Sequence, residues 1–321
     1  MKKFARSILL IMLFILLGAP SIYFDIMVPA VIDLPGDIET LAIIDRSHSE
    51  NEVVNVLEKG LLSTITGNQD RLSKYCIDGV NKQVGAGHDF QIVVTGIVEK
   101  RKGTALDLPA PMQWFEINEI CNQHNADAVL ALEIFSRQYI DNVAEVKVGF
   151  RIYHPGKKMI IDEFQYYHGI GKGGRLPAED PASIMLNAVN SDDAMKKASY
   201  LAGTLYGKRI APFWIRAERH YYKRSKGDPC MKQGARMMEV NDWDAAITAL
   251  QYALENGHRK TRGRAAHNLA VVYEITGQLD LARETAQMGW GKFGNKKARD
   301  YAAILQQRIN EINMLRIQEE N

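Results

Sequence analysis

Two stretches near the end of the chain share one pattern of small and apolar residues, and this repeat limits the fold more than any other feature. The segment NDWDAAITALQYALENG, residues 241–257, has apolar residues at intervals of three and four, the spacing of one helix face. Thirty-six residues later the segment TGQLDLARETAQMGW carries equivalent residues at Leu279, Ala282, Ala286 and Gly289. Small residues at matched positions let antiparallel helices approach closely. We therefore predict stacked helix pairs from residue 228 onward.

The helix before each of these segments matches as well, with Gly234 equivalent to Ala270 and Met237 equivalent to Tyr273. The pattern resembles the tetratricopeptide repeat, whose usual period is about 34 residues, with the excess placed in a loop around 256–264. A further helix over 296–316 would cap the stack. The residues that we expect to pack within and between repeats are Gly234, Trp243, Ala246, Ala253, Ala270, Tyr273 and Ala282.

Residues 37–208 alternate between short apolar runs and longer amphipathic ones, as expected for a mixed sheet with helices against it. Strands are predicted at 41–44, 90–98 and 127–135, and helices around 54–65, 69–84, 114–121 and 194–205. The clearest strand is 145–153, where Val146, Val148, Phe150 and Ile152 share one face. HPGK then provides a turn, and 159–167 returns as the second strand of a hairpin.

These patterns predict an α+β protein of two domains, which the length of 321 residues accommodates. A mixed-sheet α/β sandwich domain spans 37–208, a junction spans 209–227, and an all-α, tetratricopeptide-like array with a capping helix spans 228–321. Residues 1–21 form a separate leader. The composition, with 46% hydrophobic and 24% charged residues, is that of a folded globular protein and excludes a largely disordered or multispanning one.

The leader has Lys2, Lys3 and Arg6 before an apolar run over 8–17. About ten apolar residues suit a signal peptide, whereas a membrane-spanning helix needs roughly 20. Because residues 18–21 give no clean cleavage site, an uncleaved anchor remains the alternative, helped by the second apolar stretch at 22–32. We expect an exported protein of the periplasm or cell envelope, associated with the membrane through its N-terminus.

No residue pattern indicates catalysis, a cofactor or a metal. Cys76, Cys121 and Cys230 lack metal-ligand spacing, and the eight histidines form no metalloprotease motif. The run over Gly169–Arg175 satisfies G-x-G-x-x-G, yet Pro177 and Pro181 follow where a phosphate-binding helix would begin. We interpret it as a flexible loop and predict a protein that is not an enzyme and holds no cofactor.

Charge is distributed unevenly along the chain. Residues 1–208 carry 21 Lys and Arg against 25 Asp and Glu, and residues 209–321 carry 19 against 13. This balance could steer an acidic partner toward the array, although a small net charge can also serve solubility alone. The segment ERHYYKR around His220 interleaves aromatic and basic residues, which we assign to the end of an element at the domain junction. Nucleic acid is not the expected partner.

The order of LAIID, NADAVLALEI, RHYYKR and AAHNLAVVYEITGQLDLA resembles an uncharacterised family of bacterial envelope proteins. Its members are typically lipoproteins that join an α/β domain to a tetratricopeptide tail. This chain has Ala19 and Pro20 where the family usually has the lipidated cysteine. The strand at Leu41 and the segment 126–129 also resemble the α/β domain of curli-secretion-channel and synthase-activator lipoproteins. Both resemblances imply protein partners in the envelope and no catalytic residue.

We therefore expect a non-enzymatic envelope scaffold or adaptor that binds a protein or peptide through its array. The candidate partner-binding residues are Asn268, Tyr273 and Glu274, on a predicted concave face. Each of them could instead belong to an ordinary solvated helix face. The rival hypothesis is an envelope protein that binds a nucleotide or small ligand with the Gly169–Arg175 run.

Overall fold

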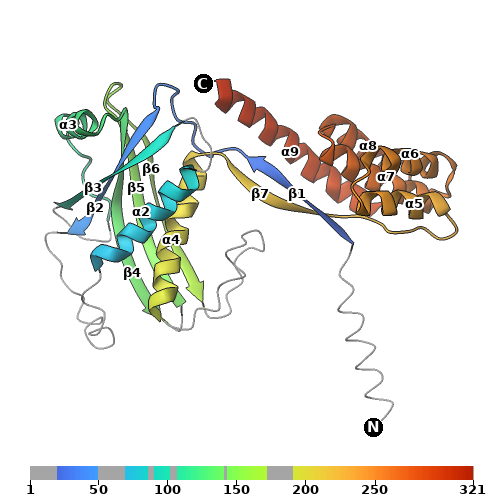
Figure 1. Ribbon diagram of the computed structural model, residues 1–321, viewed down its shortest axis with the longest axis horizontal. Helices are drawn as coiled ribbons and strands as arrows, with labels where there is room; N and C mark the ends of the chain where they lie inside the picture. Colours follow the sequence, from blue (N-terminus) through green and yellow to red (C-terminus); the bar gives the residue numbers. More distant parts are fainter. Residues whose placement is uncertain are drawn as a thin grey trace, which may run out of the picture. The chain divides into compact units, whose positions relative to one another are not determined.

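The computed structural model describes residues 20–49, 69–85, 90–101, 107–140, 143–171 and 191–320. It has a mixed sheet in the N-terminal part and a run of helices in the C-terminal part, which confirms the predicted α+β class (Figure 1). Two compact units divide the chain. The sheet unit comprises Met27–Ile215 with Ile317–Asn321, and the helical unit comprises Met1–Ile26 with Arg216–Arg316.

The sheet unit is built on five strands in the order β3-β2-β4-β5-β6. Strands β3, β2 and β4 are parallel, and β5 and β6 continue the sheet as an antiparallel hairpin. The predicted strands are present, and most are longer than expected: β2 is Thr40–Ser49, β3 Gln91–Arg101, β4 Ala128–Ile140, β5 Val143–His154 and β6 Met159–Gly171. The predicted helix at 54–65 lies outside the described residues.

Alternating side chains give the sheet two apolar faces. Leu41 and Leu130, with the apolar residues of β5 that the sequence placed on one side, pack against α2 (Gln69–Val84) and α4 (Ser191–Ile210). Figure 1 shows these two helices side by side across the sheet. Ala42 and Val129 face the other way, toward α3 (Trp114–His124). The central strands are therefore buried on both faces, which explains their continuous apolar runs.

The helices of the helical unit are α5 (Pro229–Glu239), α6 (Trp243–Asn256), α7 (Arg259–Ile275), α8 (Leu279–Gly291) and most of α9 (Lys296–Glu320). Consecutive helices from α5 to α8 pack on one another, and α9 adds Tyr301 and Leu305 to their common core. Asp228 and Asp242 cap α5 and α6, because their side chains accept hydrogen bonds from the amides of Met231 and Ala245.

Residues 22–32, expected as apolar support for an anchor, contain most of the strand β1 (Ser21–Val28). This strand pairs with β7 (Phe213–His220) in a two-stranded sheet. The expected junction of 209–227 thus includes a regular strand, and the division between the two units passes through both strands. Within the described residues, none of the helices has the length and apolar character needed to cross a membrane.

Candidate functional site

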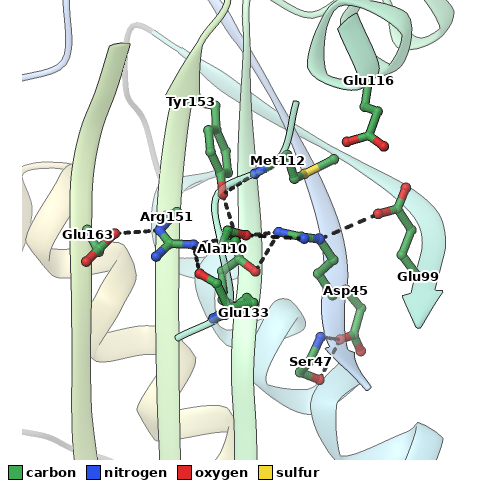
Figure 2. Close-up of polar contacts among 12 residues, drawn as sticks. Asp45, Ser47, Glu99, Ala110, Met112, Glu116, Glu133, Arg151, Tyr153 and Glu163 are labelled. Atoms are coloured by element: carbon green, nitrogen blue, oxygen red, sulfur yellow. Dashed lines mark hydrogen bonds and ion pairs between the residues drawn. The ribbon is translucent and has the colours of Figure 1, made fainter. Parts of the chain in front are cut away.

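The sheet unit holds a buried group of charged and polar side chains on the face covered by α3 (Figure 2). Its centre is Glu133 on β4, which has no exposed surface. Arg46 on β2 and Arg151 and Tyr153 on β5 surround the carboxylate. We call these four residues the Glu133 cluster. Three neighbouring strands of the sheet thus contribute to one site.

Alternation along β4 places the carboxylate on this face, together with Val129 and Ala131, and an irregularity in the strand follows. Leu132 pairs with Phe150 and Ile134 pairs with Gly149, so one residue of β4 is extra relative to β5. Such a bulge interrupts the alternation of side chains and redirects them locally. Leu132 and Phe135 both belong to the core under α2 and α4, whereas Glu133 lies between them on the opposite face. The bulge therefore returns Phe135 to the face of Leu132, beyond the cluster.

The carboxylate of Glu133 is compensated by three donors. Arg46 Nη1 lies 3.0 Å and 2.9 Å from its two oxygens, and Arg151 Nη1 lies 3.5 Å from Oε1. The hydroxyl of Tyr153 donates to Oε1 at 2.6 Å. A buried charge is tolerated only with partners of this kind, because its desolvation is costly. Burial, followed by the charge of Glu133, raises the pKa of Tyr153 to about 12.

The cluster also holds the segment that leads into α3. Arg151 Nη1 donates to the carbonyl of Pro109 at 2.7 Å, and Arg46 Nη2 lies 3.5 Å from the carbonyl of Ala110. The amide of Met112 donates to the Tyr153 hydroxyl at 3.3 Å. Figure 2 shows these contacts converging on one side of the sheet. The arrangement fixes a loop and the start of a helix to the strands.

Two further carboxylates contact the arginines at the rim. Glu163 on β6 accepts from Arg151 Nε at 2.5 Å, and Glu99 on β3 lies 3.7 Å from Arg46 Nε. Burial raises the pKa of Glu99, and the nearby Arg46 opposes that shift. Each arginine of the cluster thus contacts one buried and one more exposed carboxylate. The cluster forms a closed ionic network.

The polar groups of this network are engaged with one another. A tyrosine with a pKa near 12 stays protonated at neutral pH, and the Glu133 oxygens are occupied by donors. Burial also raises the thiol pKa of Cys76, and that of Cys121 to about 11, so neither is a ready nucleophile. In the described ranges, no group of three or more His, Cys, Asp or Glu side chains is placed to hold a metal ion.

The Glu133 cluster is not evident from the amino-acid sequence alone. Its signal was one acidic residue inside the apolar run AVLALEIF, with arginines in two other strands. A charge in a strand that is buried on both faces requires a partner of opposite charge. An acidic residue in such a strand therefore predicts a buried ion pair, but local sequence does not determine which strands are neighbours.

The residues expected to pack the repeats lie in the core of the helical unit. Ala246, Ala253, Ala270 and Ala282 are almost fully buried, Tyr273 is 6% exposed, and Trp243 packs against the same core. A Cβ added to Gly234 would lie 2.6 Å from Cγ of Leu250. Small side chains at these positions therefore permit the close approach of neighbouring helices.

The predicted concave face lined by Asn268, Tyr273 and Glu274 is wrong in its geometry, because all three side chains are buried. Asn268 bonds the backbone N–H and C=O of Tyr222, both at 2.8 Å. Glu274 accepts two bonds from Arg219, at 2.8 Å and 2.9 Å, and a further bond from the Tyr301 hydroxyl. Their partners come from β7, the segment after it and α9. Sequence periodicity does not predict that these elements contact α7.

The structure also describes the other two segments noted in the sequence, around His220 and Gly169. His220 ends β7, as expected for an element boundary, and its Nδ1 lies 2.8 Å from the Ser21 hydroxyl. Gly169–Gly171 belongs to β6 and pairs with β5, so this part of the glycine run is a strand and not a loop. The remaining residues of the run lie outside the described ranges. A strand in an antiparallel ladder lacks the helix N-terminus that a phosphate site requires.

Comparison with known families identifies a family model that matches the sheet unit. A family model described as a domain of unknown function, DUF8603, matches residues 38–222, more than half of the chain. The chain belongs to the DUF8603 family. The matched range of this DUF8603 protein includes the whole Glu133 cluster. A second model, also a domain of unknown function and named DUF6340, matches residues 232–312 in the helical unit. A search of curated proteins found no match to the chain.

Solved structures give only distant similarities to the DUF8603 protein. The PelC dodecamer from Paraburkholderia phytofirmans is 9% identical over 59% of this chain and 98% of its own, with a TM-score of 0.30. The hypothetical protein CT253 from Chlamydia trachomatis is 7% identical over 52% and 95%, with a TM-score of 0.27. Lipoprotein GNA1162 from Neisseria meningitidis is 12% identical over 49% and 96%, with a TM-score of 0.22. Scores this low support no conclusion about function.

Proposed function

We propose that the protein is a non-enzymatic scaffold or adaptor of the cell envelope that holds a protein partner through its helical unit. The observation that carries this proposal is which charged side chains form ion pairs and which do not. The buried arginines of the sheet unit are paired with carboxylates. In the helical unit, Arg259, Lys260 and Lys296 line one cavity and form no ion pair with any carboxylate in the described residues. Unpaired surface charge is available for a partner of opposite sign.

The sheet unit supports a scaffold role through its rigidity. The Glu133 cluster joins three strands and the loop before α3, and its donors and acceptors are used within the unit. Removing one member of such a network is costly, which favours one fixed conformation. A rigid network whose polar groups bind one another suits the positioning of a partner.

The envelope assignment rests on the leader. Its three basic residues and its short apolar run follow the pattern of an export signal. Helical arrays of this kind commonly present extended binding surfaces. Large apolar side chains are exposed on the array at Tyr252 of α6, Leu281 and Trp290 of α8 and Ile304 of α9. They offer apolar contact area on the same unit.

Site-specific photocrosslinking in intact cells tests the proposal with the full chain. A photoreactive residue is placed at Tyr252 or Trp290 in the helical unit, and at Phe115 or Tyr167 in the sheet unit as matched exposed aromatic positions. We expect one reproducible protein adduct from the helical positions and not from the sheet positions. The partner identified by mass spectrometry must then bind the purified full chain. Adducts from the sheet positions alone would contradict the proposal.

A further inference from the structure

The helical unit contains a cavity of about 550 Å³ where α7 and α9 begin. Four cationic side chains line it, together with two aromatic ones, and no carboxylate of the described residues does. The cations are Arg259, Lys260, Arg264 and Lys296, and the aromatic residues are Tyr222 and Phe293. A cavity of this size is within the range of ligand sites in proteins, roughly 300 to 1,000 Å³.

Three of these cations have no ion-pair partner in the part of the chain that the structure describes. Arg264 is occupied, because its Nη1 donates to the carbonyl of Arg224 at 2.8 Å and its guanidinium lies 5.0 Å from the centre of the Tyr222 ring. Arg259, Lys260 and Lys296 make no ion pair with a described carboxylate. Like charges gathered without counter-ions repel one another, so an anion entering the cavity relieves that repulsion.

The helix ends strengthen the positive potential. The first turns of α7 and α9 both contribute to the lining. His258, the N-cap of α7, forms no side-chain capping bond, so it does not satisfy the first amides of that helix. Free amides and the helix dipole both favour negative charge at this end. The dipoles thus act in the same direction as the side chains.

The floor of the cavity is already formed. Asn295 Nδ2 donates to the carbonyl of Gly263 at 2.8 Å, and Asn295 Oδ1 accepts from the Tyr222 hydroxyl at 3.3 Å and from the amide of Ala298 at 3.1 Å. A Cβ added to Gly263 would lie 3.1 Å from Cβ of Phe293. These contacts connect α7, α9 and the segment after β7, so binding needs little reorganisation.

We propose that this cavity binds an acidic segment of the partner protein, with several Asp or Glu side chains. The inference rests on the proposed function and specifies the chemistry of the partner. Several separate cations in a volume this large match several carboxylates better than one small anion. Lys260 and Lys296 act as flexible point charges, which suits the variable spacing of side-chain carboxylates.

The test measures fluorescence anisotropy of a labelled peptide of about ten residues, alternating Glu and Gly, with the purified full chain. The control peptide replaces each Glu by Gln. One triple variant is Arg259→Gln, Lys260→Gln and Lys296→Gln. The matched variant removes three exposed cations of the same unit outside the cavity, Lys226→Gln, Lys232→Gln and Arg236→Gln. Circular dichroism confirms that both variants are folded.

We expect the acidic peptide to bind the native chain and the matched variant, and to bind the cavity variant at least about tenfold more weakly. Raising the salt concentration should weaken binding, since exposed charges are screened. Equal loss in both variants, binding of the Gln peptide, or occupation by inorganic phosphate with exclusion of the peptide would each overturn the inference. If the crosslinked partner is retained by the cavity variant, the adaptor function stands and only this site is wrong.

Discussion

Gly203 on α4 lies directly against the backbone carbonyl of Cys76 on α2, so close that an added Cβ would overlap that oxygen. The reciprocal contact places Gly79 of α2 against the backbone of Tyr200 on α4. Two glycines therefore let the helices that cover one sheet face approach each other at the backbone level. The close packing of this layer depends on the absence of a side chain at both positions.

Gly203→Ala is expected to destabilise the sheet unit by about 1 to 3 kcal/mol, because the backbone must move to relieve the overlap. Urea denaturation followed by circular dichroism measures the change in the free energy of unfolding. Gly156→Ala is the control, since the nearest atom to its added Cβ is Cε1 of the His154 side chain, at 3.3 Å. Equal stability of the two variants would show that α2 and α4 do not pack this closely.

Glu133→Gln is expected to cost about 3 kcal/mol, since it leaves Arg46 and Arg151 without their buried counter-charge. Glu163→Gln removes a carboxylate that also bonds Arg151 but is 45% exposed, and it should cost less than about 1 kcal/mol. Chemical denaturation of both variants gives the comparison. A cost for Glu163→Gln that matches or exceeds that of Glu133→Gln would argue against the cluster as the core of the network.

The helical unit should lose stability as the pH falls from about 6.5 to 4. Burial lowers the pKa of His267 to about 4, and its Nδ1 has no described hydrogen-bond partner. Between these pH values the unfolded chain binds a proton that the folded chain excludes, so stability is full above the unfolded pKa and declines below it. The difference between this pKa and the ordinary histidine pKa near 6.5 corresponds to about 3 kcal/mol of unfolding free energy in total.

His267→Gln retains a donor for the carbonyl of His220, which His267 contacts at 2.9 Å, and cannot titrate. We expect this variant to lose that part of the pH dependence, measured as urea midpoints at several pH values. The same slope in the native chain and the variant would assign the effect to other groups.

Ala246→Trp should unfold the array locally, because Ala246 has no exposed surface in the core between α5 and α6. Overpacking costs typically about 1 to 3 kcal/mol, and an indole ring should exceed the lower end. Thr248→Trp, at an exposed position of the same helix, is the matched control. Thermal melting and helix content, measured by circular dichroism, distinguish the two variants. If Ala246→Trp melts like the native chain and keeps its helix content, the proposed repeat register is wrong.

The protein should be exported and remain in the membrane fraction, given the basic residues and apolar run of its leader. Cell fractionation, with protease treatment of spheroplasts, measures this directly. Replacing Lys2, Lys3 and Arg6 by Glu should impair export, because positive charge before the apolar run orients the segment. Recovery of the native chain in the cytosol, protected from protease, would contradict the assignment.

The sequence by itself determined the elements whose periodicity is local. The boundaries of α2 agree with the predicted 69–84, and one-sided alternation in β5 identified the face that meets α2 and α4. The repeat also located the small residues of the array, since two packed helices require matching small side chains. These features are readable because backbone geometry fixes the spacing of residues on one face.

Tertiary structure alone decided which distant residues meet. Periodicity suggested an open face for Asn268 and Glu274, but the segment ending at Tyr222 supplies Arg219 and a backbone edge that cover them. In the same way, the order of the strands brings Glu133 to two arginines. Such contacts depend on strand order and chain crossing, and local periodicity carries no information about either.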